Sequence, residues 1–158
     1  MTEPQSPMST IYQGWLTYQT LLIKALTPLS PDQLALRAAP TLRSIGEIGT
    51  HMIGARARWM GEGGDAFAAM GEWDRQGMPT RSAAELVAGL ETTWQGMQDA
   101  IARWTLADWQ QTYAGEDPGE PATITRPWVI WHLIEHDLHH GGEIGLTLGM
   151  HGLSAPDL

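Results

Sequence analysis

Four stretches of the chain repeat apolar residues at steps of three and four, the spacing that places them on one face of an α-helix. The most regular of these stripes is Leu86, Leu90, Trp94, Met97, Ile101 and Trp104. We expect the four helices at about residues 8–27, 42–61, 82–104 and 125–150. Because four long amphipathic helices bury their apolar faces against one another, the pattern predicts an all-α protein, a four-helix bundle with long inter-helix connections.

The ends of these helices carry ordinary stop and start signals. Pro28 closes the first, Ser82 and Glu85 form a capping box for the third, and Thr125 is the expected cap of the fourth. A short helical turn is expected within residues 30–37. The connections over residues 62–80 and 105–124 are long enough to span the bundle, and a loop as long as the first usually holds a short element or serves the site. We interpret residues 1–158 as a single domain.

Composition narrows the functional classes. The formal net charge is −9, so the surface disfavours nucleic acid and anionic membranes as partners. Cysteine is absent, which excludes disulfides, thiolate ligands and a cysteine nucleophile. No signal peptide or membrane-length apolar run is visible, so a cytoplasmic location is expected. Eight tryptophans exceed the needs of a core this size, which favours a homodimer as well as a small-molecule cavity.

Four of the six histidines fall within residues 132–140. His132, His136 and His140 recur every four residues, so they form one ridge of the last helix. Two imidazoles at that spacing can bind one divalent cation, and either 132/136 or 136/140 has the right step. A third ligand is available in His51, which shares the inward stripe of the second helix. The pattern therefore predicts a three-histidine metal site between two helices.

Two other metal-enzyme patterns fit the same residues poorly. The segment His136-Asp-Leu-His-His140 resembles the zinc-protease arrangement, but Asp137 replaces the glutamate base and is one methylene shorter. A di-iron carboxylate bundle needs a Glu-x-x-His motif on each of two helices. No such motif occurs in the chain, which excludes that class.

The chain resembles the DinB/YfiT-like family of small bacterial metal-binding bundles over nearly its whole length. The resemblance rests on Ile48-Gly-Thr-His51-Met-Ile-Gly-Ala55, with Trp59 two turns on, and on His136-Asp-Leu-His-His140-Gly-Gly-Glu143. It implies that His51, His136 and His140 are the metal ligands and that His132 falls one turn outside. Many relatives carry Arg-Gly-Gln after the last histidine, whereas this chain has Gly141-Gly142-Glu143.

The resemblance also implies a function. It points to a metal-dependent hydrolase or a transferase that uses a low-molecular-weight thiol such as bacillithiol or mycothiol. Three neutral imidazoles leave a coordination position open, which is typical of catalytic sites. Such an ion can bring the pKa of bound water near neutrality or bind a thiol as thiolate. The ion expected is zinc or nickel, with iron or manganese as alternatives.

Candidate catalytic and binding residues lie near the three histidines. Glu47 and Glu143 are the candidate general bases, although either can instead orient a histidine. Arg56 and Arg58 are candidates for clamping an anionic substrate, and Trp59 for walling the pocket. The competing functional class is a non-catalytic, metal-binding, stress-related dimeric protein.

Overall fold

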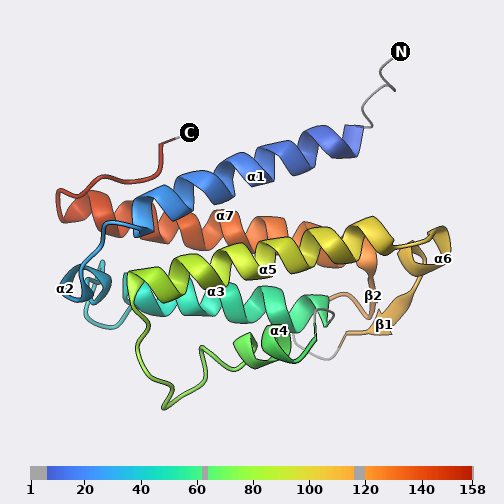
Figure 1. Ribbon diagram of the computed structural model, residues 1–158, viewed down its shortest axis with the longest axis horizontal. Coiled ribbons are helices and arrows are strands. Elements are labelled where there is room, and N and C mark those ends of the chain that lie inside the picture. Colours follow the sequence, from blue (N-terminus) through green and yellow to red (C-terminus); the bar gives the residue numbers. More distant parts are fainter. Residues whose placement is uncertain (1–6, 62–63, 116–119, 158) are drawn as a thin grey trace.

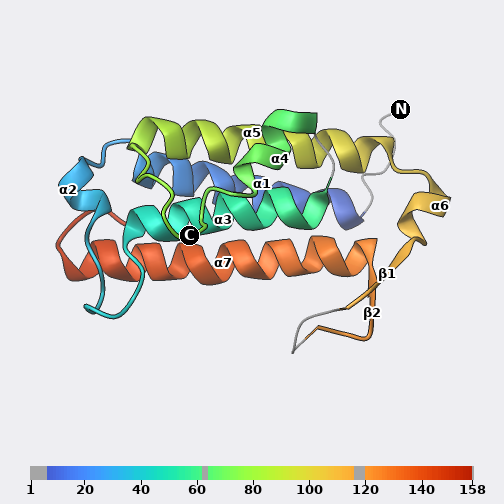
Figure 2. The ribbon, with the colours of Figure 1, turned by 90° about the horizontal axis from the view of Figure 1, so that it is seen from below.

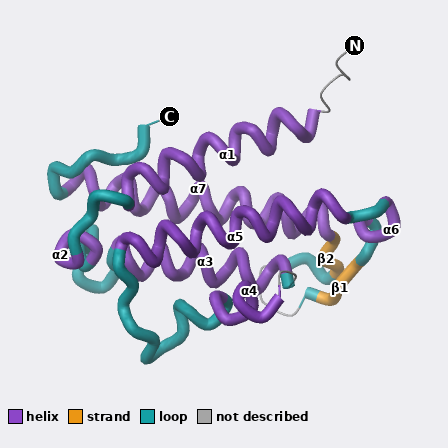
Figure 3. Tube along the Cα trace, viewed as in Figure 1, coloured by secondary structure: helices purple, strands orange, loops and turns teal. Residues whose placement is uncertain are grey.

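The structure, a computed structural model, describes residues 7–61, 64–115 and 120–157. Four long helices account for most of the chain: α1 (Pro7–Leu26), α3 (Ile45–Met60), α5 (Ala83–Arg103) and α7 (Arg126–Met150). Three short helices join them: α2 (Pro31–Leu34), α4 (Gly64–Met70) and α6 (Leu106–Trp109). One small antiparallel hairpin pairs β1 (Thr112–Ala114) with β2 (Thr123–Thr125). The prediction of an all-α protein is confirmed, since the hairpin is the sole sheet among the described residues (Figure 3).

The long helices lie side by side, and α3 and α1 each contact both α5 and α7 (Figures 1 and 2). Figure 1 shows that α3 and α5 run in the same direction, while α1 and α7 run in the opposite one. The connection between α3 and α5 therefore runs back along the molecule, and its length was sufficient for it to span the bundle. The described parts of the segment between α5 and α7, which are α6 and the hairpin, lie at one end of the molecule.

Side-chain caps set where the helices begin. Ser44 caps α3, because its Oγ accepts from the backbone N–H of Glu47 at 3.2 Å while the Glu47 carboxylate accepts from the N–H of Ser44 at 2.7 Å. This capping box starts α3 at Ile45, three residues later than the apolar periodicity suggested. Gly61 ends the helix with φ of +60°, a conformation that glycine adopts without strain. The predicted caps of α5 and α7, Ser82 and Thr125, are confirmed.

Two apolar clusters fill the interior, one towards the α2 end and one towards the hairpin end. The buried polar side chains of the described residues include at least one from each long helix, among them Gln19, Arg56, Thr93 and Asp137. Burying such groups is tolerated only when they are hydrogen-bonded. Arg56 meets this condition through Asp137, with Nη2 2.7 Å from Oδ2, and through Gln19, with Nη2 2.7 Å from Oε1. This polar layer ties α3 to α7 and α1 in the middle of the molecule.

No helix of the described residues is long and apolar enough to cross a membrane.

Candidate metal site

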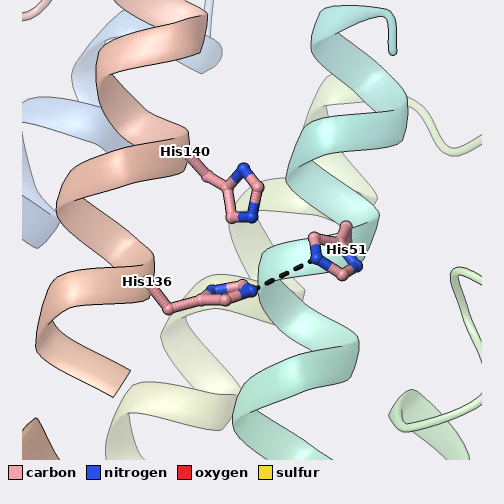
Figure 4. Close-up of side chains that lie close together, drawn as sticks. All are labelled: His51, His136 and His140. Carbon is pink, nitrogen blue, oxygen red and sulfur yellow. Dashed lines mark hydrogen bonds between the residues drawn. The ribbon is translucent and has the colours of Figure 1, made fainter. Parts of the chain in front are cut away.

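Three imidazoles converge between α3 and α7 (Figure 4). His51 comes from α3, and His136 and His140 come from successive turns of α7. The ring centroids lie 4.9 Å apart for His51 and His136, 4.8 Å for His51 and His140, and 4.4 Å for His136 and His140. Each ring offers a nitrogen within 4.8 Å of the others. The sequence left two ligand pairs open on α7, and the structure brings 136/140 to His51.

Two carboxylates hold the rings in one orientation. Asp74, from the segment between α4 and α5, has Oδ2 2.8 Å from Nδ1 of His51. Glu143, one turn beyond His140, has Oε2 2.7 Å from Nδ1 of that ring. A carboxylate accepts hydrogen bonds, so in each ring Nδ1 carries the proton and Nε2 presents its lone pair. This carboxylate–histidine arrangement is the one that orients histidines around metal ions.

The environment keeps all three rings neutral. Burial lowers the pKa of His136 to about 3, and the neighbouring imidazoles add to the effect. Burial also lowers the pKa of His51, assisted by the nearby charge of Arg43, although the hydrogen bond to Asp74 opposes the shift. The pKa of His140 is lowered by burial against the opposing effect of Glu143. Neutral imidazole is the form that binds a metal, so near pH 7 no proton competes at these nitrogens.

The spacing of the nitrogens fits one divalent cation. Nε2 of His136 lies 3.2 Å from Nε2 of His51. Two nitrogens about 2.0–2.1 Å from one tetrahedral ion lie roughly 3.3–3.4 Å apart, so this contact matches the edge of a coordination tetrahedron. If this contact were a hydrogen bond, neutral His136 would have one proton to donate to the two acceptor nitrogens that face it. The buried Nδ1 of His136 has no partner in the described part of the chain. One cation would satisfy all three Nε2 atoms together.

Asp74 itself is held in place by a second residue. Arg58 donates from Nη1 to Oδ1 of Asp74 at 2.7 Å and from Nη2 to Oδ2 at 3.0 Å. Burial acts to raise the pKa of Asp74, but the hydrogen bonds from Arg58 and His51 outweigh it and hold that pKa below its usual range. The carboxylate is therefore charged and would offset part of the charge of a bound cation. Arg58, a candidate substrate clamp, thus serves to position Asp74.

Several of the predicted site residues have other roles. Glu47 was a candidate base, but its carboxylate caps α3 and pairs with Arg37 at 2.7 Å. Arg56 was a candidate substrate ligand, but it is 1% exposed and is committed to Asp137. The same ion pair is inconsistent with Asp137 acting as the base of a zinc-protease site, because its carboxylate points into the core. The second candidate base, Glu143, lies beside the site and is engaged with His140.

The aromatic neighbours form a small stack one turn from the site. His132 lies parallel to Trp128 at 4.9 Å, and Nδ1 of His132 is 3.1 Å from Oε1 of Glu135. Trp59 packs against both rings, at 5.4 Å from Trp128 and 4.8 Å from His132. His132 is absent from the convergent group, whereas Trp59 stays a candidate wall residue.

Sequence reasoning missed Asp74. The only signal for it was the length of the 62–80 connection, which suggested that the loop holds an element or serves the site; α4 and Asp74 show that it does both. No spacing rule links residue 74 to residue 51, so the pairing depends on where the returning segment crosses α3.

Comparison with known proteins assigns the chain to a family. None of the curated proteins compared with the chain matches it. Among solved structures, a DinB-like protein from Bacillus cereus ATCC 10987 matches with a TM-score of 0.70 and 20% sequence identity, covering 93% of this chain and 94% of the other. At that sequence identity the structural similarity supports the fold alone. The family model of the DinB superfamily matches residues 17–144, a span that includes all three histidines. The chain belongs to the DinB superfamily.

Proposed function

We propose that the protein is a metal-dependent enzyme that acts on a small molecule, either as a hydrolase or as a transferase that uses a low-molecular-weight thiol. Its four long helices would form a DinB-like bundle around one divalent ion bound by His51, His136 and His140. The observation that carries this proposal is the convergence of three neutral imidazoles, two of them oriented by carboxylates.

The protein's own groups would prepare the site for such chemistry. Asp74 holds a proton on Nδ1 of His51, and Glu143 holds one on Nδ1 of His140, so both rings direct Nε2 inward. A divalent ion there would supply Lewis acidity, lowering the pKa of a bound water or thiol. Because the chain has no cysteine, a thiol would have to arrive as a co-substrate. The carboxylates of both candidate bases are engaged, which favours a positioning role for Glu143.

The competing class is a non-catalytic metal-binding protein with a stress-related role. Metal-loaded protein should be screened for ester and amide hydrolysis and for thiol conjugation, with and without bacillithiol, mycothiol or glutathione. We expect turnover that is lost in His51→Ala. Turnover that survives in the metal-free variant would exclude the proposed mechanism, and no turnover in any assay would favour the binding protein.

The carboxylate that orients His51 gives a second test, on metal affinity. Asp74→Asn keeps the size of the side chain but removes its charge and weakens its acceptance from Nδ1 of His51. Removing such a partner costs roughly 10–100-fold in metal affinity, measured by competition with a chelator. The matched control is Asp99→Asn at an exposed position of α5, where the carboxylate accepts from Gln95 at 2.8 Å. Equal affinities for the two variants would contradict the role given to Asp74.

We also propose that the protein is a homodimer. The number of tryptophans, which first suggested a dimer, no longer supports it, because seven of the eight are buried or half-buried. The supporting feature is instead a set of exposed apolar side chains on α7: Trp131, Leu138, Leu146 and Met150. Apolar surface of this kind favours self-association. Light scattering at micromolar concentration should give the mass of two chains, and Leu146→Lys should reduce it; a single-chain mass for the unaltered protein would refute the dimer.

A further inference from the structure

A cavity of about 710 Å³ lies beside His51, one of the three histidines of the candidate metal site. Its walls come from the α2 region and residues 41–47 on one side and from residues 73–81 on the other, and both segments lie near the first turn of α3 (Figure 1). His51 and Asp74 belong to its lining. The cavity therefore reaches the side of the candidate metal site on which Asp74 holds His51. Its volume is in the range of pockets that bind small ligands.

The charge of this cavity is opposite to that of the protein. The chain has nine lysines and arginines and a net charge of −9, yet four arginines line the cavity: Arg37, Arg43, Arg75 and Arg81. The lining includes two carboxylates, those of Glu47 and Asp74. Such a concentration of cations in a concave surface raises the local concentration of small anions.

Three of the four arginines have carboxylate partners within 3.2 Å, in the pairs Arg37–Glu47, Arg75–Glu72 and Arg81–Glu85. Arg43 has no hydrogen-bond or ion-pair partner among the residues that the structure describes. It lies next to the capping residue of α3 and close enough to His51 for its charge to be felt by that ring. Arg43 is thus the cation in this cavity whose charge is available to a ligand.

The rest of the lining offers apolar surface. Trp73 forms part of the wall, and the guanidinium of Arg81 lies over its ring with 4.4 Å between Cζ and the centroid. Leu42 and Met78 also line the cavity and are 52% and 45% exposed, although both are large apolar side chains. Ligand pockets typically combine such apolar walls with a few polar groups that fix orientation.

We propose that this cavity binds a small organic anion, an apolar or aromatic body that carries a carboxylate or phosphate group, with Arg43 as the cation that meets its charge. The apolar body lies against Trp73 and the side chains of Leu42 and Met78. Because the lining includes His51, a ligand bound here is held next to the metal site. The assignment of this anion as the substrate rests on the proposed function, whereas its binding does not.

The test uses benzoate and phenyl phosphate as probes, with benzamide as the neutral counterpart of benzoate. Binding is followed by NMR through the indole N–H signal of Trp73, which is identified by its absence from Trp73→Phe. We expect both anions to shift this signal saturably and benzamide to bind more weakly. Arg43→Gln should weaken anion binding roughly tenfold, the effect of losing one charge-assisted hydrogen bond. Arg103→Gln, an equal charge change on an exposed residue at the far end of α5, should leave it unchanged.

Equal affinities in Arg43→Gln and Arg103→Gln would overturn the proposal, as would binding of benzamide as tight as that of benzoate. Comparison of the two anions decides whether the site prefers a carboxylate or a phosphate. The titrations are repeated on chelator-treated protein. Anion binding that persists there supports the cavity proposal even if the protein proves to bind no metal or to turn over no substrate. Loss of anion binding in metal-free protein would instead show that the anion binds the metal, and would overturn the role of Arg43.

Discussion

Asp137 separates a structural from a catalytic interpretation of the last helix. It follows His136 directly, in the position that a zinc-protease pattern gives to the base, yet it is 0% exposed and bonded to Arg56 and to the indole Nε1 of Trp15, at 2.7 Å. The change Asp137→Asn keeps the shape of the side chain and removes the charge. Arg56, itself 1% exposed, then has only neutral acceptors among the described residues: the amide oxygen introduced at position 137, Oε1 of Gln19 and the carbonyl oxygen of Leu90.

A buried cation that loses its counter-charge destabilises the native state by about 3–5 kcal/mol. Because a domain is stabilised by only about 5–15 kcal/mol in total, the change should be large relative to the whole. The free energy of unfolding is measured by urea denaturation, on chelator-treated protein because a bound ion would add its own stabilisation. The matched control is Glu72→Gln, which breaks an exposed pair with Arg75 and should cost less than about 1 kcal/mol.

The double variant Arg56→Met/Asp137→Leu extends the test. It replaces both charges with apolar side chains, and such replacements of buried pairs are often neutral or stabilising, so most of the lost stability should return. A loss below about 1 kcal/mol in Asp137→Asn would refute the reasoning, since it would mean that Arg56 reaches water. Turnover abolished without loss of stability would restore the catalytic interpretation.

Three further outcomes are expected. His136→Ala should lose the divalent ion and His132→Ala should keep it, as shown by elemental analysis of protein purified without a histidine tag. Retention in His136→Ala would refute the three-histidine site, and loss in His132→Ala would move the ligand pair to 132/136. The folded-state pKa of His136 is depressed from 6.5 to about 3, so below pH 6.5 the unfolded chain binds a proton that the folded chain excludes. The free energy of unfolding of metal-free protein should therefore fall between pH 6.5 and about 3, and His136→Gln should flatten this fall; an equal slope in both proteins would contradict it. Gly141→Ala places a Cβ against Tyr18 and should lower the free energy of unfolding by about 1–3 kcal/mol. In Gly142→Ala the Cβ meets nothing within 4 Å, so the free energy of unfolding should rise by about 0.5–1 kcal/mol. Equal unfolding midpoints for the two variants would be inconsistent with this packing.

Much of the fold was accessible from the sequence, because helix periodicity and capping are local. The stripe from Leu86 to Trp104 and the caps Ser82 and Thr125 involve residues within a few positions of one another, so their geometry follows from the helix itself. The start of the second long helix was placed three residues too early, because the Ser44–Glu47 capping box overrides the apolar pattern that precedes it.

The candidate site also combines features that one helix determines with features that depend on the packing of two helices. The spacing of His136 and His140 is a property of one helix, and so is the position of Glu143 one turn beyond. The sequence alone did not decide between the pairs 132/136 and 136/140, because both have the same step. The packing of α3 against α7 places His140, rather than His132, in the group with His51 and His136, with the ring centroids of His51 and His140 4.8 Å apart.

The roles of the charged residues around the site are what the sequence predicted least well. Arg56 and Glu47 were plausible site residues because a sequence gives their type and helix position, but a partner from another element determines their role. The burial of Arg56 depends on Asp137, 81 positions away, and the positioning of His51 on Asp74, 23 positions away. The sequence by itself determined the helices and the histidine ridge, since those depend on neighbours along the chain. Only the tertiary structure decided which charges are buried, which orient the rings, and that Arg43 is left facing a cavity, because those depend on which segments pack together.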